Sequence, residues 1–215
     1  MFKSKKSNNT NIYKLIEIVL LFIVTPIVLI TPTHVSIKIG YLLLGVIYIS
    51  FVSSKKEAFK KRKIESKISN NALKRIGLRF IVIAVSTTLF VYFQDRTLLF
   101  SVMLNKTSLW LKFNLIYVLV SVIPQELIYR TFFVKRYQKL FKNEFLFIII
   151  NAALFSFGHI WFQSWIVLGF TFVGGVLFIK TYLKTKSLGL VLFEHSLYGV
   201  WLYTVGYGKL FLFPV

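Results

Sequence analysis

Cysteine is absent from the 215-residue sequence, and acidic residues are scarce. The missing cysteine excludes disulfides, thiolate zinc sites, cysteine nucleophiles and palmitoylated cysteines within this sequence. The 7 Asp and Glu residues stand against 27 Lys and Arg, which gives a formal charge of +20. Such a charge raises the question of nucleic acid, but the basic residues lie in short stretches between long apolar runs. This pattern fits an anionic membrane surface better, so we expect anionic lipid at the basic loops and no nucleic-acid partner.

Charged residues of both signs make up only 16% of the chain, whereas 56% is hydrophobic and the mean hydropathy is +0.71. An average soluble domain carries about a quarter charged residues, so this apolar excess must face lipid. Apolar runs long enough to cross a bilayer occur at about 13–31, 35–53, 77–95, 111–136, 144–163, 165–183 and 187–205. The sequence shows no internal repeat. We therefore predict an all-α fold: one polytopic transmembrane helix bundle of about seven spans.

The distribution of basic residues predicts the orientation of the bundle. With the N-terminus in the cytoplasm, 22 of the 27 Lys and Arg residues fall inside and 5 outside, as the positive-inside rule requires. We therefore expect an N-in, C-out protein. The first apolar run, 15–30, is long and has no small-residue cleavage site, so it reads as an uncleaved span. The composition, rich in Lys, Ile, Asn and Phe, indicates an AT-rich bacterial genome, and hence a multi-pass protein of a bacterial plasma membrane.

Ionisable side chains within the spans are the candidates for function, because burying charge in a bilayer is costly. Glu126 and Arg130 are four residues apart, so they share a helix face and can pair. Two interpretations stay open. The pair could fix this helix against a neighbour, or the cation could orient a carboxylate that holds water or a metal.

Two of the three histidines also lie in apolar spans: His159, after a Phe-Ser-Phe-Gly sequence, and His195, directly after Glu194. A single histidine in such a helix is usually an interhelical hydrogen-bonding group. Two histidines together with a buried glutamate can instead bind zinc or polarise a water molecule. Glu126, His159 and His195 are therefore the candidate metal ligands, with zinc and a metal-free water both open.

Three short motifs in this order resemble the CPBP family, the CAAX proteases and bacteriocin-processing (Abi) membrane proteins. The motifs are Gln125-Glu126-x-x-x-Arg130, Phe155-x-x-x-His159 and His195-x-x-x-Gly199, and each alone is weak. The resemblance implies a protease-like core at 110–205. On either side of this core we expect N-terminal transmembrane helices with a basic cytoplasmic loop at 1–109 and a C-terminal tail at 206–215.

The resemblance implies hydrolysis of a peptide bond within the membrane. A glutamate and the first histidine, His159, would activate a water molecule, Arg130 would orient the glutamates, and His195 would stabilise the oxyanion. Two positions depart from the family pattern. Gln125 stands where the first glutamate is expected, and an amide is not a useful base. Gly199 stands where a side-chain donor, usually Asn, is expected.

These motifs favour an intramembrane endopeptidase that acts on a membrane-associated peptide or protein, in bacteriocin maturation or self-immunity. The candidate catalytic residues are Gln125, Glu126, Arg130, His159 and His195. The departures at Gln125 and Gly199 favour an alternative, a catalytically impaired member that works by binding, as an immunity or regulatory protein. A small transporter is a third possibility, but it predicts repeats or broken helices in matching halves, and neither is visible.

Overall fold

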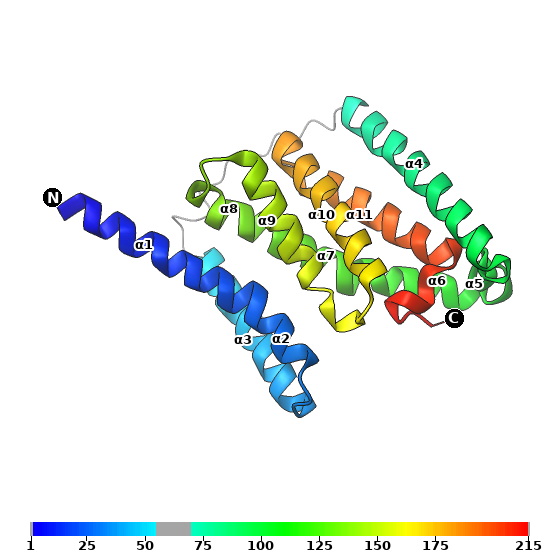
Figure 1. Cartoon of the computed structure of the whole chain (residues 1–215), viewed down its shortest axis with the longest axis horizontal. Coiled ribbons are helices and arrows are strands. Elements are labelled where there is room, and N and C mark those ends of the chain that lie inside the picture. The colour runs from blue at the N-terminus through cyan, green and yellow to red at the C-terminus, as the bar shows by residue number, and fades with distance from the viewer. Residues whose placement is uncertain (1, 55–69, 215) are drawn as a thin grey trace. The chain divides into compact units, whose positions relative to one another are not determined.

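A computed structural model describes residues 2–54 and 70–214 of the chain. Every element within these ranges is a helix, and the described residues include no strand, so the predicted all-α fold is confirmed (Figure 1). Most of the predicted basic loop, residues 55–69, lies outside the described residues.

The α-helices are joined by short 3₁₀ and π-helical segments, so that several of them form longer continuous helices. The α-helices are α1 (Phe2–Val19), α2 (Thr25–Ile30), α3 (Val35–Ser54), α4 (Asn70–Gln94), α5 (Ser101–Asn105), α6 (Thr107–Ile116), α7 (Ile123–Glu126), α8 (Phe133–Tyr137), α9 (Glu144–Phe157), α10 (Trp165–Thr185) and α11 (Leu188–Leu202). The π-helical segments are Leu20–Val24, Tyr117–Val122, Leu127–Phe132 and Tyr203–Tyr207, and the 3₁₀ segments are Arg96–Leu98, Gln138–Leu140, Ile160–Phe162 and Gly208–Phe211.

Six helices in the described residues are long and apolar enough to cross a membrane, one fewer than the sequence predicts. They are Asn11–Ile30, Val35–Ser54, Asn70–Gln94, Thr107–Leu140, Trp165–Thr185 and Leu188–Phe211. Each corresponds to one predicted apolar run. The chain is therefore a polytopic membrane protein, as its composition requires.

The predicted span at 144–163 is instead the shorter apolar helix α9. Its 14 residues reach about 21 Å at 1.5 Å per residue, less than the roughly 30 Å hydrocarbon core. The side chain of Asn143 begins the helix by accepting hydrogen bonds from the backbone N–H groups of Phe145 and Leu146. The helix ends at Phe157, but the following 3₁₀ turn, Ile160–Phe162, is also apolar, so hydropathy alone overestimates the length of the helix.

The chain divides into two compact units, and two of the boundaries between them, after Arg130 and after Val176, fall within helical segments. The first unit comprises Met1–Arg62 and Thr131–Val176. Its buried charge is Glu17, whose carboxylate forms an ion pair with Arg136 at 3.0 Å and accepts a hydrogen bond from the Tyr48 hydroxyl at 2.8 Å. These contacts join α1 to α8 and α3. In the same unit α9 and α10 approach closely, because a Cβ atom on Gly175 would lie 3.0 Å from the Cα atom of Ala152.

The second unit comprises Lys63–Arg130 and Leu177–Val215. In this unit α4 packs beside α11 (Figure 1). The contact includes an ion pair at 3.0 Å between Arg79 of α4 and the fully buried carboxylate of Glu194. Tyr198 donates a hydrogen bond to the same carboxylate at 2.9 Å. About one helical turn after Tyr198, the indole of Trp201 donates a hydrogen bond to the Thr87 hydroxyl of α4 at 3.0 Å.

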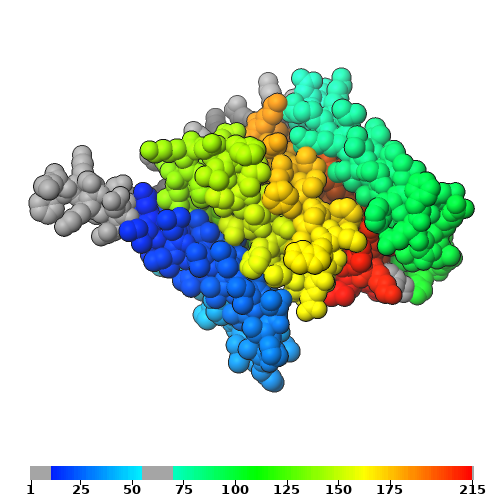
Figure 2. Space-filling model, viewed as in Figure 1, coloured from blue at the N-terminus to red at the C-terminus, as the bar shows by residue number. Residues whose placement is uncertain are grey.

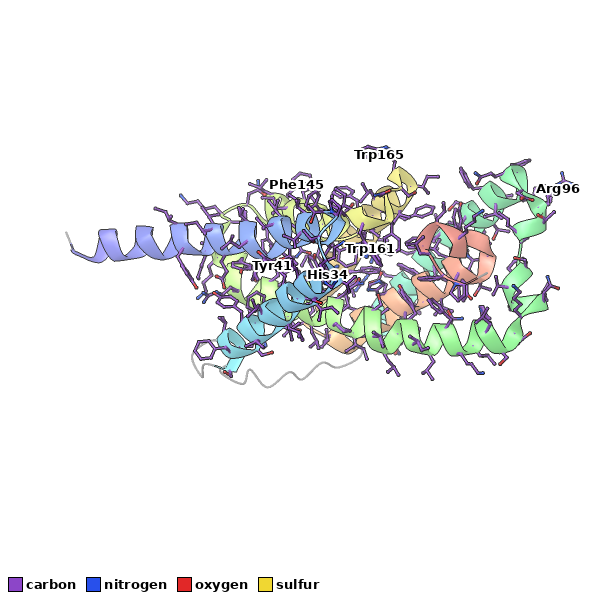
Figure 3. The ribbon with its side chains drawn as sticks, turned by 90° about the horizontal axis from the view of Figure 1, so that it is seen from below. His34, Tyr41, Arg96, Phe145, Trp161 and Trp165 are labelled. Atoms are coloured by element: carbon purple, nitrogen blue, oxygen red, sulfur yellow. The ribbon has the colours of Figure 1, made fainter. Side chains whose placement is uncertain are left out.

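Apolar side chains cover much of the helix surface that lipid would contact. Helix α3 has no buried residue, and its side chains, with those of α2 and of α1 from Asn11 onwards, form the blue surface of Figure 2. Trp161, in the 3₁₀ segment after α9, and Trp165, the first residue of α10, are both exposed (Figure 3). Exposed tryptophans near helix ends are typical of membrane–water interfaces.

Candidate active site

The helix that carries the first motif contains a proline near its middle. Pro124 lacks a backbone N–H and cannot continue the regular hydrogen-bond pattern. The chain accommodates it with a wider π-helical segment on either side of α7, Tyr117–Val122 and Leu127–Phe132. Such insertions are frequent at functional sites. Gln125 and Glu126 lie between the two π-helical segments.

Glu126 and Arg130 form a buried ion pair, as their spacing predicts. The Nε atom of Arg130 lies 3.0 Å from one carboxylate oxygen, Oε2, of Glu126, and both side chains are fully buried. Burying either charge alone would be costly, so each is retained in the apolar bundle with the help of the other. The guanidinium also lies over the ring of Phe178, 5.8 Å from its centroid.

The other carboxylate oxygen of Glu126 contacts His195, a residue 69 positions later on α11. The Nδ1 atom of His195 lies 2.8 Å from Oε1 of Glu126. A carboxylate only accepts hydrogen bonds, so the imidazole donates from Nδ1, and in its neutral form the basic lone pair is on Nε2. The ring stacks on Phe178, with centroids 4.5 Å apart. Glu126 is thus held between a cation and an imidazole whose tautomer it fixes.

Glu194 precedes His195 but takes no part in this arrangement. Its carboxylate faces Arg79 and Tyr198, and the same Arg79 nitrogen donates to the Thr181 hydroxyl at 3.1 Å. Adjacent residues on a helix project about 100° apart. The two side chains therefore face different neighbours, and Glu194 serves the contact between α4 and α11.

Gln125 hydrogen-bonds within its own helix. Its Nε2 atom donates to the Ser121 hydroxyl at 2.9 Å, and its carbonyl oxygen is buried with no hydrogen-bond partner among the described residues. Such an orphaned acceptor calls for an explanation, for which a bound water or ligand is the usual one. The carbonyl can accept a hydrogen bond from a water molecule, although it cannot take its proton.

His159 belongs to the first unit, whereas Glu126 and His195 belong to the second. It follows α9, with its Nδ1 atom 2.7 Å from the carbonyl oxygen of Phe155. Its ring lies between Phe155 and Phe162, with centroid separations of 4.9 and 6.0 Å. The motif residues Phe155 and His159 thus contact each other. Association of His159 with the Glu126 site stays a prediction.

The third histidine lies apart from any such cluster. His34 is exposed in the turn before α3, and its Nδ1 atom hydrogen-bonds with Ser36 (Figure 3). Within the described residues, no three His, Asp or Glu side chains gather closely enough to hold a metal ion. Both carboxylate oxygens of Glu126 already face Arg130 and His195. The residues present therefore do not fit a zinc ion bound by Glu126 and His195.

Tyr117, which is not among the residues predicted from the sequence, lies against His195. The two rings meet at 80° with centroids 6.3 Å apart. A signal was available, because Tyr117, Ser121 and Gln125 recur every four residues as polar side chains in an otherwise apolar run. Gly199, one turn after His195, also lies against the Tyr117 ring.

Comparison with known protein families identifies a match over part of the chain. Residues 106–201 match the model of the Rce1-like family, described as type II CAAX prenyl endopeptidase Rce1-like. The matched segment contains all three motifs. No curated protein and no solved structure gives a significant match.

Proposed function

We propose that the chain is an endopeptidase similar to the Rce1-like family, whose model residues 106–201 match, and that it hydrolyses a peptide bond in a membrane-associated substrate. The observation that carries the proposal is the buried Arg130–Glu126–His195 arrangement. It couples a carboxylate to an imidazole in an apolar surrounding, a combination that can transfer protons during hydrolysis of a peptide bond.

The geometry supports His195 as the base in place of the missing glutamate at position 125. With Nδ1–H directed at Glu126, Nε2 can take a proton from a water molecule as its oxygen attacks the carbonyl carbon. Glu126 stabilises the imidazolium that results, and Arg130 holds Glu126 in place. The imidazolium then returns the proton to the leaving amine. The Gln125 carbonyl would orient the water, and His159 would assist, as the family resemblance implies.

A substrate anchored in the bilayer fits a site built within membrane helices. The prenyl endopeptidases of the matching family point to prenylated protein C-termini as substrates, and bacteriocin maturation or self-immunity is a second setting. We propose a bacterial plasma membrane as the location. No step of this mechanism passes through a metal ion.

One observation favours a second function. Gln125 stands where the family has a glutamate, and its carbonyl oxygen is buried without a partner among the described residues. A member that has lost hydrolysis would still bind a peptide there and would act in immunity or regulation. The two functions differ in one measurable respect, the release of a cleaved product.

The test is cleavage by the full-length protein in lipid vesicles, with a farnesylated Cys-aliphatic-aliphatic-X peptide as the probe. Mass spectrometry would follow release of the C-terminal tripeptide. We expect wild type to cleave the probe. His195→Gln should lower the rate by about 100- to 10,000-fold, the usual contribution of a general base. Glu126→Gln should lower it comparably, because the tautomer of His195 is no longer fixed.

Three controls make the result decisive. The amount of folded protein is matched by size-exclusion chromatography, and His34→Gln, which changes the exposed histidine, should leave the rate unchanged. Addition of 1,10-phenanthroline should also leave it unchanged. If wild type releases no product while Gln125→Glu does, the binding function replaces hydrolysis.

A further inference from the structure

We propose that the Tyr117 hydroxyl is a catalytic hydrogen-bond donor to the carbonyl oxygen of the scissile peptide bond. The inference rests on the proposed function and adds a residue to it. Tyr117 begins the π-helical segment Tyr117–Val122, which packs against α11 in the second unit.

The position of the hydroxyl is defined by a residue without a side chain. A Cβ atom placed on Gly199 would lie 2.5 Å from Cζ of Tyr117, and closer still to its hydroxyl oxygen. The hydroxyl therefore occupies the volume in which a side chain at position 199 would begin. Gly199 lies four residues after His195, so the two share a face of α11, and the hydroxyl lies on the same face as the imidazole.

Neighbouring rings hold Tyr117 in this place. Its ring packs edge-on against the His195 ring, and its centroid lies 5.5 Å from the centroid of the Phe213 ring. Its hydroxyl makes no hydrogen bond to any residue that the structure describes. A tyrosine O–H in an apolar bundle normally finds a partner. A donor on the same face of α11 as His195, with no hydrogen-bond partner among the described residues, is suited to a substrate oxygen.

Two further polar groups on this helix indicate that a ligand with peptide-like groups binds alongside. Asn114, one turn before Tyr117, has both its carboxamide oxygen and its nitrogen buried without a partner among the described residues. The carbonyl oxygen of Gln125 is in the same condition. Together they present a donor and two acceptors, which match the N–H and C=O groups of an extended peptide.

The role of Tyr117 in the reaction follows from charge development. As the water oxygen bonds to the carbonyl carbon, the electron pair of the C=O double bond moves to the carbonyl oxygen. The Tyr117 O–H donates a hydrogen bond to that oxygen and keeps its proton. When the C–N bond breaks, the pair returns to the carbonyl, and the amine leaves with the proton that His195 held. The donor is needed most at the tetrahedral stage.

The test compares Tyr117→Phe with wild type, as full-length proteins in vesicles with the farnesylated peptide. Loss of one oxyanion donor should lower kcat by roughly 100- to 1000-fold and leave KM nearly unchanged. The matched control is Tyr203→Phe, which removes a buried hydroxyl bonded to the Pro214 carbonyl at 2.7 Å in the same unit. That variant should retain the wild-type kcat.

A second measurement follows binding. A phosphinate analogue of the peptide carries a negative oxygen where the tetrahedral intermediate does, so Tyr117→Phe should weaken its binding while leaving binding of the uncleaved peptide unchanged. A third measurement tests rescue. When Gly199→Asn is added to Tyr117→Ala, the asparagine should place a hydrogen-bond donor in the same volume and recover part of kcat.

The outcomes separate the inference from the function on which it rests. If wild type cleaves the probe and Tyr117→Phe keeps both its kcat and its affinity for the phosphinate, the inference is wrong and the proposed function stands. If wild type neither cleaves the peptide nor prefers the phosphinate, the proposed function fails, and the inference fails with it.

Discussion

At Gly199 the backbone of α11 passes so close to the Tyr117 ring that no space is left for a methyl group. The closeness has nothing to do with backbone freedom, since Gly199 lies within the regular helix α11. It reflects packing alone. The same is true of Gly175, which lies against Ala152 in the first unit.

We predict that Gly199→Ala destabilises the protein only while Tyr117 is present. The added methyl group would collide with a ring that is itself packed against His195 and Phe213, and overpacking of this kind typically costs 1–3 kcal/mol. Truncation of Tyr117 to Ala opens the space. The two changes together should therefore cost less than the sum of the single changes.

Thermal unfolding of the four proteins in one detergent measures this coupling by a double-mutant cycle. Gly40→Ala is a suitable control, because a Cβ atom there meets no other atom within 4 Å. Additive effects of Gly199→Ala and Tyr117→Ala would contradict the described contact.

Among the elements, α4 and α11 are joined by one ion pair whose two members are unequally buried. The Glu194 side chain is 0% exposed, whereas that of Arg79 is 30% exposed. An exposed fraction of this size allows the arginine to extend towards water when its partner is lost. The fully buried glutamate cannot reach water in the same way.

We therefore expect Arg79→Met to be more destabilising than Glu194→Leu. The first change leaves a buried carboxylate without its cation. Breaking a buried ion pair in this way lowers the free energy of unfolding by about 3 kcal/mol or more. The double change Arg79→Met/Glu194→Leu should restore much of the stability, because no charge then stays buried. Heat-induced aggregation in detergent would rank the variants, and equal losses for the two single changes would contradict the unequal burial.

Local elements were largely predictable from the sequence, and contacts between distant elements were not. The spacing of Glu126 and Arg130 predicts their pairing, because four residues make one helical turn. Nothing in the sequence pairs Arg79 with Glu194, 115 residues later. The length of α9 was overestimated for a different reason, since hydropathy does not distinguish an apolar helix from an apolar turn.

For the site, the sequence supplied the candidate side chains but not their roles. Glu126, Arg130 and His195 were identified as buried groups, and the structure brings these three together. That both oxygens of Glu126 are engaged, the contact on which we base the proposal of His195 as the base, follows only from the packed helices. Tyr117 was missed because its importance depends on the missing side chain at Gly199, 82 positions away.

For the whole molecule, the orientation across the membrane is the main prediction left to test. The absence of cysteine allows a direct test, because each introduced cysteine is the only thiol. We expect Thr33→Cys, in the turn between α2 and α3, to react with a membrane-impermeant maleimide in intact cells. Lys139→Cys, in the 3₁₀ segment Gln138–Leu140, should react only after permeabilisation. Both side chains are exposed.

The unmodified chain gives the background, since it contains no thiol. Labelling of Lys139→Cys but not Thr33→Cys in intact cells would reverse the predicted orientation. Labelling of both on the same side would mean that the number of spans between them is even.

The contact between Tyr117 and Gly199 also constrains how this sequence can evolve. A large side chain at position 199 is blocked while Tyr117 is present, and replacing the tyrosine first removes the hydroxyl before position 199 can offer a substitute. Neither change is neutral alone, so the two positions are epistatic and should vary together. In homologous chains, an aromatic residue at 117 should accompany glycine at 199, and a polar side chain at 199 should accompany a small residue at 117.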